Sequence, residues 1–168
     1  MKPNMQTITQ YLTVIVTLWA SSLLAQTGGL DNEGLGKLKL GQPAAKVIEV
    51  LGTPKSKGKD QLWEAIGEWV QDWEFPSQGL TVAMASNDKG GAKTIHSLTA
   101  KSGCPLATPR GIKVGSTEAS VRTAYQDVED KEQPKREHTF VAGSIYGGVI
   151  FTFKAGKVSE IFIGAAAE

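Results

Sequence analysis

The sequence has little of what usually identifies secreted or catalytic proteins. Its 168 residues include one cysteine, Cys104, and two histidines, His96 and His138. A single cysteine excludes an intramolecular disulfide, so the hydrophobic core must hold the fold without a covalent cross-link. The histidines stand far apart in the chain, outside any zinc-ligand spacing or nucleophile motif, and are interpreted as hydrogen-bonded or solvated surface side chains. No catalytic residue, metal site or cofactor is therefore predicted.

An excess of charge of one sign is also missing. The chain carries 18 Lys and Arg against 17 Asp and Glu, a formal net charge of +1. This balance favours neither a nucleic-acid partner nor an anionic membrane surface. Asp72 and Glu74 project from one face of a predicted strand, as the paired carboxylates of a glycosidase do. Strand alternation alone produces this spacing, so the pair is interpreted as part of a solvated strand.

Long apolar runs are confined to the N-terminus. Residues 11–19 are almost entirely apolar, follow the single basic Lys2, and lead to small residues that end at Ala25. This order is typical of a secretory signal peptide over residues 1–25, with the mature chain starting at Gln26. The predicted location is therefore periplasmic or extracellular. In the alternative, an uncleaved segment 8–25 anchors the protein in a membrane.

Two stretches of the sequence resemble each other. "LKLGQPAAKVIEVLGTP" covers residues 38–54, and "IKVGSTEASVRTAY" covers residues 112–125. Placing one on the other without a gap matches Gly41 to Gly115 and Val47 to Val121, and sets Leu51 on Tyr125. A match of this kind indicates a duplicated unit. Because Gly41 and Gly115 occupy the same entry to a helix, both are expected to adopt a conformation costly for other residues.

Each copy predicts one short amphipathic helix. Gly52 is expected to supply a left-handed cap at the end of the first helix, and Ser116 to cap the start of the second. The predicted buried faces are Ala44, Val47, Ile48 and Leu51 in the first copy, and Val121, Tyr125 and Val128 in the second.

Each helix is followed by a predicted β-hairpin and a last strand. In the first unit "PSQG", residues 76–79, is expected to turn the chain, so that Phe75 faces Leu80 and Trp73 faces Val82. In the second unit, Val149, Phe151 and Phe153 correspond to Leu80, Val82 and Met84. The last strands are expected at residues 95–100 and 158–163.

These features predict an α+β fold of two tandem repeats. Each repeat is a short helical element followed by a three- to four-stranded antiparallel sheet, and the two sheets lie side by side with helices on one face. The predicted organisation is a signal peptide at 1–25, a flexible segment at 26–34, a first repeat at 35–101, a linker at 102–110 and a second repeat at 111–168. Cys104 lies in that linker and is interpreted as a thiol without chemistry.

The two helix-and-hairpin segments resemble the tandem-repeat fold of the beta-lactamase inhibitory protein and the small outer-membrane assembly lipoproteins. The resemblance rests on "LKLGQPAAKVIEVLGTP" with "WEFPSQGLTVAM", and on "IKVGSTEASVRTAY" with "GGVIFTFKAGKVSEI". It implies helices on one face of paired sheets and a concave binding surface on the other. The chain lacks the anchoring cysteine of the lipoproteins and the disulfides of the inhibitor.

Strand alternation predicts which residues face away from the helices. This outer face is the candidate surface for binding a protein partner. Trp63, Trp69 and the turn residue Tyr146 are added as candidates because Trp and Tyr are common interface anchors, although a buried or half-buried position is favoured for both tryptophans. The outer-face candidates are Asp72, Glu74, Thr81, Ala83, Ile150 and Thr152.

The resulting hypothesis is an exported, non-catalytic protein-binding module, and one form of it is an inhibitor-like partner of an envelope or secreted enzyme. Two alternatives remain open: a structural or assembly component of the bacterial cell envelope, and a hydrolase without a recognisable motif. In each non-enzymatic case the partner is a protein in the periplasm, the envelope or the extracellular space.

Overall fold

The computed structural model describes residues 30–131 and 138–166. The predicted signal peptide and its cleavage site lie outside the described residues. The secondary-structure elements are η1 (Leu30–Asn32), β1 (Gly34–Leu35), β2 (Leu38–Lys39), α1 (Ala44–Leu51), β3 (Ser56–Lys57), β4 (Gln61–Trp63), β5 (Glu68–Phe75), η2 (Pro76–Gln78), β6 (Leu80–Ser86), β7 (Thr94–Ala100), α2 (Glu118–Tyr125), η3 (Gln126–Val128), β8 (Thr139–Ser144), β9 (Gly147–Lys154) and β10 (Lys157–Gly164).

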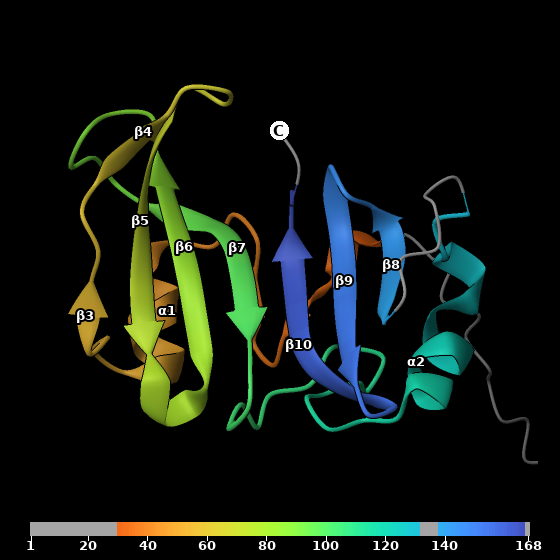
Figure 1. Ribbon diagram of the computed structural model, residues 1–168. Coiled ribbons are helices and arrows are strands. Elements are labelled where there is room, and N and C mark those ends of the chain that lie inside the picture. Colours follow the sequence, from red (N-terminus) through yellow and green to blue (C-terminus); the bar gives the residue numbers. More distant parts are fainter. Residues whose placement is uncertain (1–29, 132–137, 167–168) are drawn as a thin grey trace, which may run out of the picture.

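One antiparallel sheet dominates the molecule. Its strand order is β3-β5-β6-β7-β10-β9-β8, and β4 also pairs with β5, which makes eight strands (Figure 1). The two strand groups expected as separate sheets are joined by β7 and β10, in the register Ile161↔Ala100 and Ile163↔Leu98. The fold is α+β, with two α-helices among the described residues and a mainly antiparallel sheet.

The predicted hairpins form with the expected register. Phe75 pairs with Leu80 and Trp73 pairs with Val82 across the β5–β6 hairpin. The turn is a 3-10 turn over Pro76–Gln78, closed by Gly79 in the left-handed conformation. In the second hairpin Phe140 pairs with Phe151. Because alternate strand residues share a face, these pairs turn their side chains to the same side of the sheet.

The helices cover one side of the sheet, which we call the helix face. Val47 of α1 and both Val121 and Tyr125 of α2 are fully buried in the main core. The Tyr125 ring lies 5.0 Å from the ring of Phe151 on β9. The opposite side, which we call the open face, is turned toward the viewer in Figure 1, with α1 behind β5 and β6.

Three local expectations about the helices are wrong. Ile48 is 45% exposed, because the buried face of this short helix runs through Val47 and the partly buried Val50 and Leu51 instead. The N-cap of α2 is Thr117 and not Ser116, since the Thr117 hydroxyl accepts a hydrogen bond of 3.1 Å from Ser120 N. Gly52 has a positive φ of 81°, but its ψ of −163° lies outside the left-handed helical region.

Gly41 and Gly115 have the unusual backbone conformation expected of them, with φ values of 77° and 90°. Their surroundings also correspond. Gly41 N donates to Ile95 O at 2.7 Å, and Gly115 N donates to Val158 O at 2.8 Å. In each half, the residue that follows this acceptor is left unpaired in a β-bulge. It is His96 in β7 and Ser159 in β10. Helix entry and last strand are thus connected in the same way in both halves.

The segments expected to be flexible or to act as a linker contribute to the core. Leu30–Asn32 form a 3-10 turn, and the carboxylate of Glu33 is buried. Cys104 is a buried free cysteine with 6% exposure, and burial raises the pKa of its thiol. Within residues 30–131 and 138–166, no helix is long and apolar enough to cross a membrane.

Candidate functional site

The open face of the sheet contains a row of side chains that runs across six strands. The row follows the pairing of Glu74 with Thr81, Thr81 with Thr99, Thr99 with Phe162, Phe162 with Ile150, and Ile150 with Val141. It is acidic and polar on β5 and β6, and apolar on β10, β9 and β8. Phe162, Ile150 and Val141 are only half-buried, so this apolar part of the row remains partly accessible to solvent.

A hollow of about 440 Å³ lies on the open face where β7 and β10 adjoin, at the end of the sheet where β10 finishes. Trp63 of β4 and Phe162 of β10 provide aromatic walls, while Ala165 and Ala166 follow β10 and complete the apolar lining. Ser97 of β7 also lines it and is 6% exposed. The volume is within the range of sites that accept a small molecule or a large side chain.

Trp63 lines the hollow because β4 pairs with the first residues of β5. Its partner in the register is Glu68, whose side chain projects from the open face. The Trp63 ring packs beside a small apolar cluster made by Val70, Ala83 and Ala85. The Trp63 ring also meets the ring of His96 edge-on, with centroids 5.5 Å apart and planes at 84°. These contacts support the indole from two sides.

The acidic end of the open face consists of Glu68, Asp72 and Glu74 on β5. His96 Nδ1 lies 3.8 Å from Glu68 Oε2. Glu74 accepts a hydrogen bond of 2.9 Å from the Thr81 hydroxyl. Asp72 is exposed, and the pKa of its carboxyl is raised by partial loss of solvent and by the like charge of Glu74. This strand therefore presents negative charge on the open face.

Most of the predicted outer-face residues lie on the open face. Asp72 is exposed, and Glu74, Thr81, Ile150 and Thr152 are half-buried. Ala83 is not accessible, contrary to expectation: it is 6% exposed because it belongs to the apolar cluster against which Trp63 packs.

The other two aromatic candidates lie elsewhere. Trp69 shares the parity of Trp73 and so faces the helix side of the sheet, where Lys89 Nζ lies 5.0 Å from its ring centroid. Tyr146 is 69% exposed in the β8–β9 turn. The neighbouring Ile145 carbonyl accepts a hydrogen bond of 2.7 Å from Ala166 N, which brings this turn next to the lining of the hollow.

Sequence reasoning missed four residues that line the hollow, Phe162, Ser97, Ala165 and Ala166, and also His96, which contacts Trp63. Alternation along residues 158–163 gives a signal for Phe162, since its neighbours Ile161 and Ile163 are buried. Ser97 and His96 could not be placed in this way. The β-bulge puts two consecutive residues on the same face, and strict alternation excludes that arrangement.

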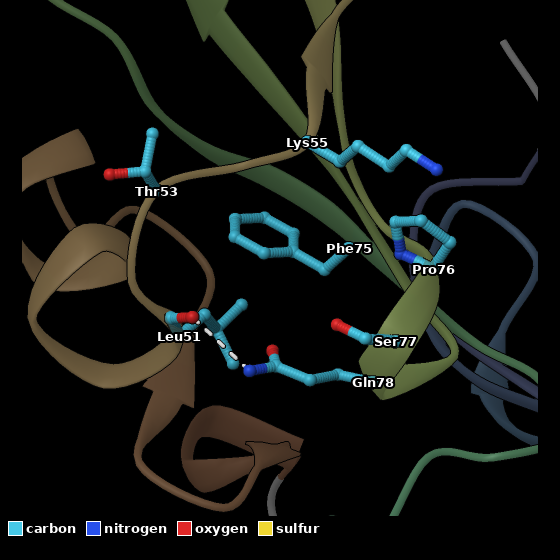
Figure 2. Close-up of a pocket in the computed structure, with 7 residues that line it drawn as sticks. All are labelled: Leu51, Thr53, Lys55, Phe75, Pro76, Ser77 and Gln78. Carbon is cyan, nitrogen blue, oxygen red and sulfur yellow. Dashed lines mark hydrogen bonds between the residues drawn. The ribbon is translucent and has the colours of Figure 1, made fainter.

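A second hollow, of about 430 Å³, lies on the helix side, where α1 ends beside the β5–β6 turn. Figure 2 shows Phe75 at its centre, with Lys55 and Ser77 around it. The Gln78 amide donates a hydrogen bond of 3.1 Å to Leu51 O, a terminal carbonyl of α1. Gln78 Oε1 is buried and accepts no hydrogen bond from the described residues. A single water molecule is sufficient to satisfy this oxygen.

A buried polar cluster joins the start of the described chain to α2. The Tyr125 hydroxyl donates a hydrogen bond of 2.9 Å to Glu33 Oε2. Arg110 Nε lies 3.4 Å from Glu33 Oε1, and Arg110 Nη1 lies 2.6 Å from Asp127. Burial raises the pKa of Glu33 and of Tyr125, whereas Arg110 lowers the pKa of Asp127. The groups satisfy one another, which indicates a structural role.

The residues considered for catalysis do not come together. Cys104 is buried among core side chains, whereas His96 lies on the open face and His138 is exposed. In the described ranges, no group of three His, Cys, Asp or Glu side chains is arranged to hold a metal ion.

Comparison of the chain with protein-family models, with curated proteins and with solved structures finds no significant match.

Proposed function

We propose that this protein is an exported, non-catalytic binding module that receives a protein partner on the open face of its sheet. The hollow between Trp63 and Phe162 carries the proposal, because it is an apolar depression in a surface that no helix of the described residues covers. Partly accessible Ile150 extends the apolar area, and Asp72 adds charge at its edge. Rigid aromatic side chains around a pocket are typical of interface anchors.

The proposal includes the origin of the fold from two tandem repeats. It is supported by the corresponding hydrogen bonds at Gly41 and Gly115, and by the β-bulges at His96 and Ser159. In this view the central β7–β10 pairing joins equivalent strands of the two units, and the binding hollow lies at their junction.

The test is capture of a partner from envelope extract by the purified chain and by two charge variants. Ile150→Asp alters the open face, whereas Ile48→Asp alters an exposed position of α1 on the opposite side. Both positions are solvent-accessible, so each variant should unfold with nearly the parent midpoint. We expect Ile150→Asp to lose the captured partner and Ile48→Asp to retain it. Equal capture by all three proteins would contradict the proposal that the open face binds the partner.

Export is tested separately by fractionation and N-terminal sequencing. A soluble periplasmic or extracellular protein that starts at Gln26 agrees with the signal peptide predicted from the apolar segment and small residues before Gln26. Retention of Met1 in a membrane fraction would instead favour the alternative role as a component of the cell envelope.

A further inference from the structure

The floor of the open-face hollow contains a polar group with no partner in the described residues. Ser97 is 6% exposed and lines the hollow, yet its hydroxyl forms no hydrogen bond to another described residue. Two other buried hydroxyl groups are paired: Ser86 donates to Asp88 O at 2.9 Å, and the Thr108 hydroxyl accepts from Ile112 N at 3.2 Å. The Ser97 oxygen is not one of the fully buried unpaired atoms of the described residues, so solvent reaches it and it is available to a group that enters the hollow.

The other residues that line the hollow indicate which kind of side chain fits it. Trp63, Phe162, Ala165 and Ala166 present indole, phenyl and methyl surfaces. Aromatic rings pack favourably against one another in offset or edge-on arrangements, so a flat aromatic ring suits the space between Trp63 and Phe162. No carboxylate lines this hollow among the described residues. A guanidinium or ammonium group would therefore lose its hydration without gaining an ion pair.

The geometry points to a phenol ring, and we propose that the hollow receives a tyrosine side chain of the partner protein. The ring would lie between Trp63 and Phe162, and its hydroxyl would exchange a hydrogen bond with Ser97. A phenylalanine would fill the same space but leave the Ser97 hydroxyl unpaired. This inference rests on the proposed function, since it names the group by which a partner occupies the open face.

Trp63 is fixed for this role before binding. Its ring is supported by the edge of His96 and by the cluster of Val70, Ala83 and Ala85. Ser97 lies on β7, which pairs on both sides with β6 and β10. A site built on paired strands loses little conformational freedom when the ring enters, which favours binding.

The experiment is an NMR titration of the purified protein with three side-chain analogues: p-cresol for tyrosine, toluene for phenylalanine and n-propylguanidinium for arginine. The amide signals of Ser97 and Gly164 and the indole signal of Trp63 report on the hollow. We expect p-cresol to bind about five- to tenfold more tightly than toluene, the factor that one neutral hydrogen bond contributes. We expect propylguanidinium to bind more weakly than p-cresol.

Ser97→Ala should reduce p-cresol affinity to that of toluene and leave toluene binding unchanged. The matched control is Ser159→Ala, which removes a half-buried hydroxyl from the other β-bulge, where it donates to Thr152 O at 3.1 Å. This control should bind p-cresol as the parent does. Equal affinity for p-cresol and toluene, tighter binding of propylguanidinium, or an unaffected Ser97→Ala variant would each overturn the inference.

A second arm distinguishes a protein tyrosine from a free phenol. N-acetyl-tyrosinamide should bind with the Ser97-dependent preference over N-acetyl-phenylalaninamide that p-cresol shows over toluene. Binding of p-cresol without N-acetyl-tyrosinamide would overturn the assignment to a protein partner. These results are independent of the capture experiment: a hollow without phenol preference ends this inference, whereas capture sensitive to Ile150→Asp would still support the open face as an interface.

Discussion

At the scale of single residues, the backbone conformation of Gly115 gives a direct prediction. Its φ of 90° is unfavourable for residues with a side chain, yet a Cβ there would meet nothing within 4 Å. Gly115→Val should therefore lose about 1–3 kcal/mol of unfolding free energy through backbone strain alone. Chemical denaturation measures the loss.

The control for this strain is Gly147→Val. Gly147 is exposed and also has open space around its Cβ position, but its φ lies outside the positive region. It should therefore unfold close to the parent midpoint. If the two valine variants were equally stable, conformational strain at Gly115 would not explain the choice of glycine.

The raised pKa of the Glu33 carboxyl predicts that the unfolding free energy depends on pH. Burial raises its pKa above the ordinary value of 4.5, and the hydrogen bond from Tyr125 and the charge of Arg110 oppose this shift without cancelling it. The folded state then binds the Glu33 proton more tightly than the unfolded state does. Its contribution to stability is complete below pH 4.5 and declines as the pH rises through the raised pKa.

The comparison is between the parent and Glu33→Gln, which keeps an acceptor for the Tyr125 hydroxyl. Denaturation from pH 4 to pH 8, roughly the range in which such a shift acts, should show the parent losing unfolding free energy relative to the variant. A parent that instead gained stability relative to the variant would mean that the attraction of Arg110 exceeds the cost of burial.

At the scale of elements, a buried ion pair fastens the β6–β7 loop to the segment before β4. Lys93 Nζ lies 2.6 Å from Asp60 Oδ1 and also donates to Trp69 O and Ser86 Oγ. Gly90 N donates to the other Asp60 oxygen at 2.7 Å. The two charged side chains are only 8% and 14% exposed. Removing one of them therefore leaves the other charge buried without its partner.

Asp60→Ala should cost about 1.5–3 kcal/mol, the contribution of hydrogen bonds to a charged group, and the double variant Asp60→Leu with Lys93→Met should cost less than the single one. The hydrogen bond from Lys93 holds the pKa of Asp60 below 3.8, so its contribution is present above that value and is lost as the pH falls. Denaturation at neutral pH measures the unfolding free energy of both variants and shows which one is less stable. A double variant as unstable as Asp60→Ala would show that packing of the methylene groups, and not the unpaired charge, causes the loss.

At the scale of the whole molecule, both halves share one core. A single buried cluster contains Val47 and Trp73 from the first half together with Val121 and Phe151 from the second. The β7–β10 pairing also continues the sheet across the junction. We therefore expect the protein to unfold in one transition and not as two separate repeats.

In a chain that starts at Gln26 the tryptophans are Trp63, Trp69 and Trp73, which all lie in the first half, so tryptophan fluorescence of that chain reports on this half. Phe151→Leu makes a cavity in the second half, where the side chain is fully buried. If the halves unfold together, Phe151→Leu should shift the unfolding midpoint measured by fluorescence as much as the midpoint measured by far-UV circular dichroism. A fluorescence transition that stayed at the parent value would show that the halves unfold independently.

The sequence by itself determined the local structure of this protein. Alternation along residues 69–84 specified which side chains face the core, because successive strand residues point to opposite sides. The match between Gly41 and Gly115 identified two positions of unusual backbone conformation. "PSQG" fixed the register of the β5–β6 hairpin, since a short turn leaves little choice of pairing.

Only the tertiary structure decided where the candidate site lies. Trp63 and Phe162 line the same hollow because β7 pairs with β10, and this pairing between distant segments has no signature in the local pattern. The β-bulge at His96 turns Ser97 to the open face, against the simple alternation. Ala83 is covered because β4 lies along β5 and brings Trp63 over it. Local periodicity assigns residues to faces, but long-range pairing determines which residues on a face lie together and which of them remain accessible to solvent.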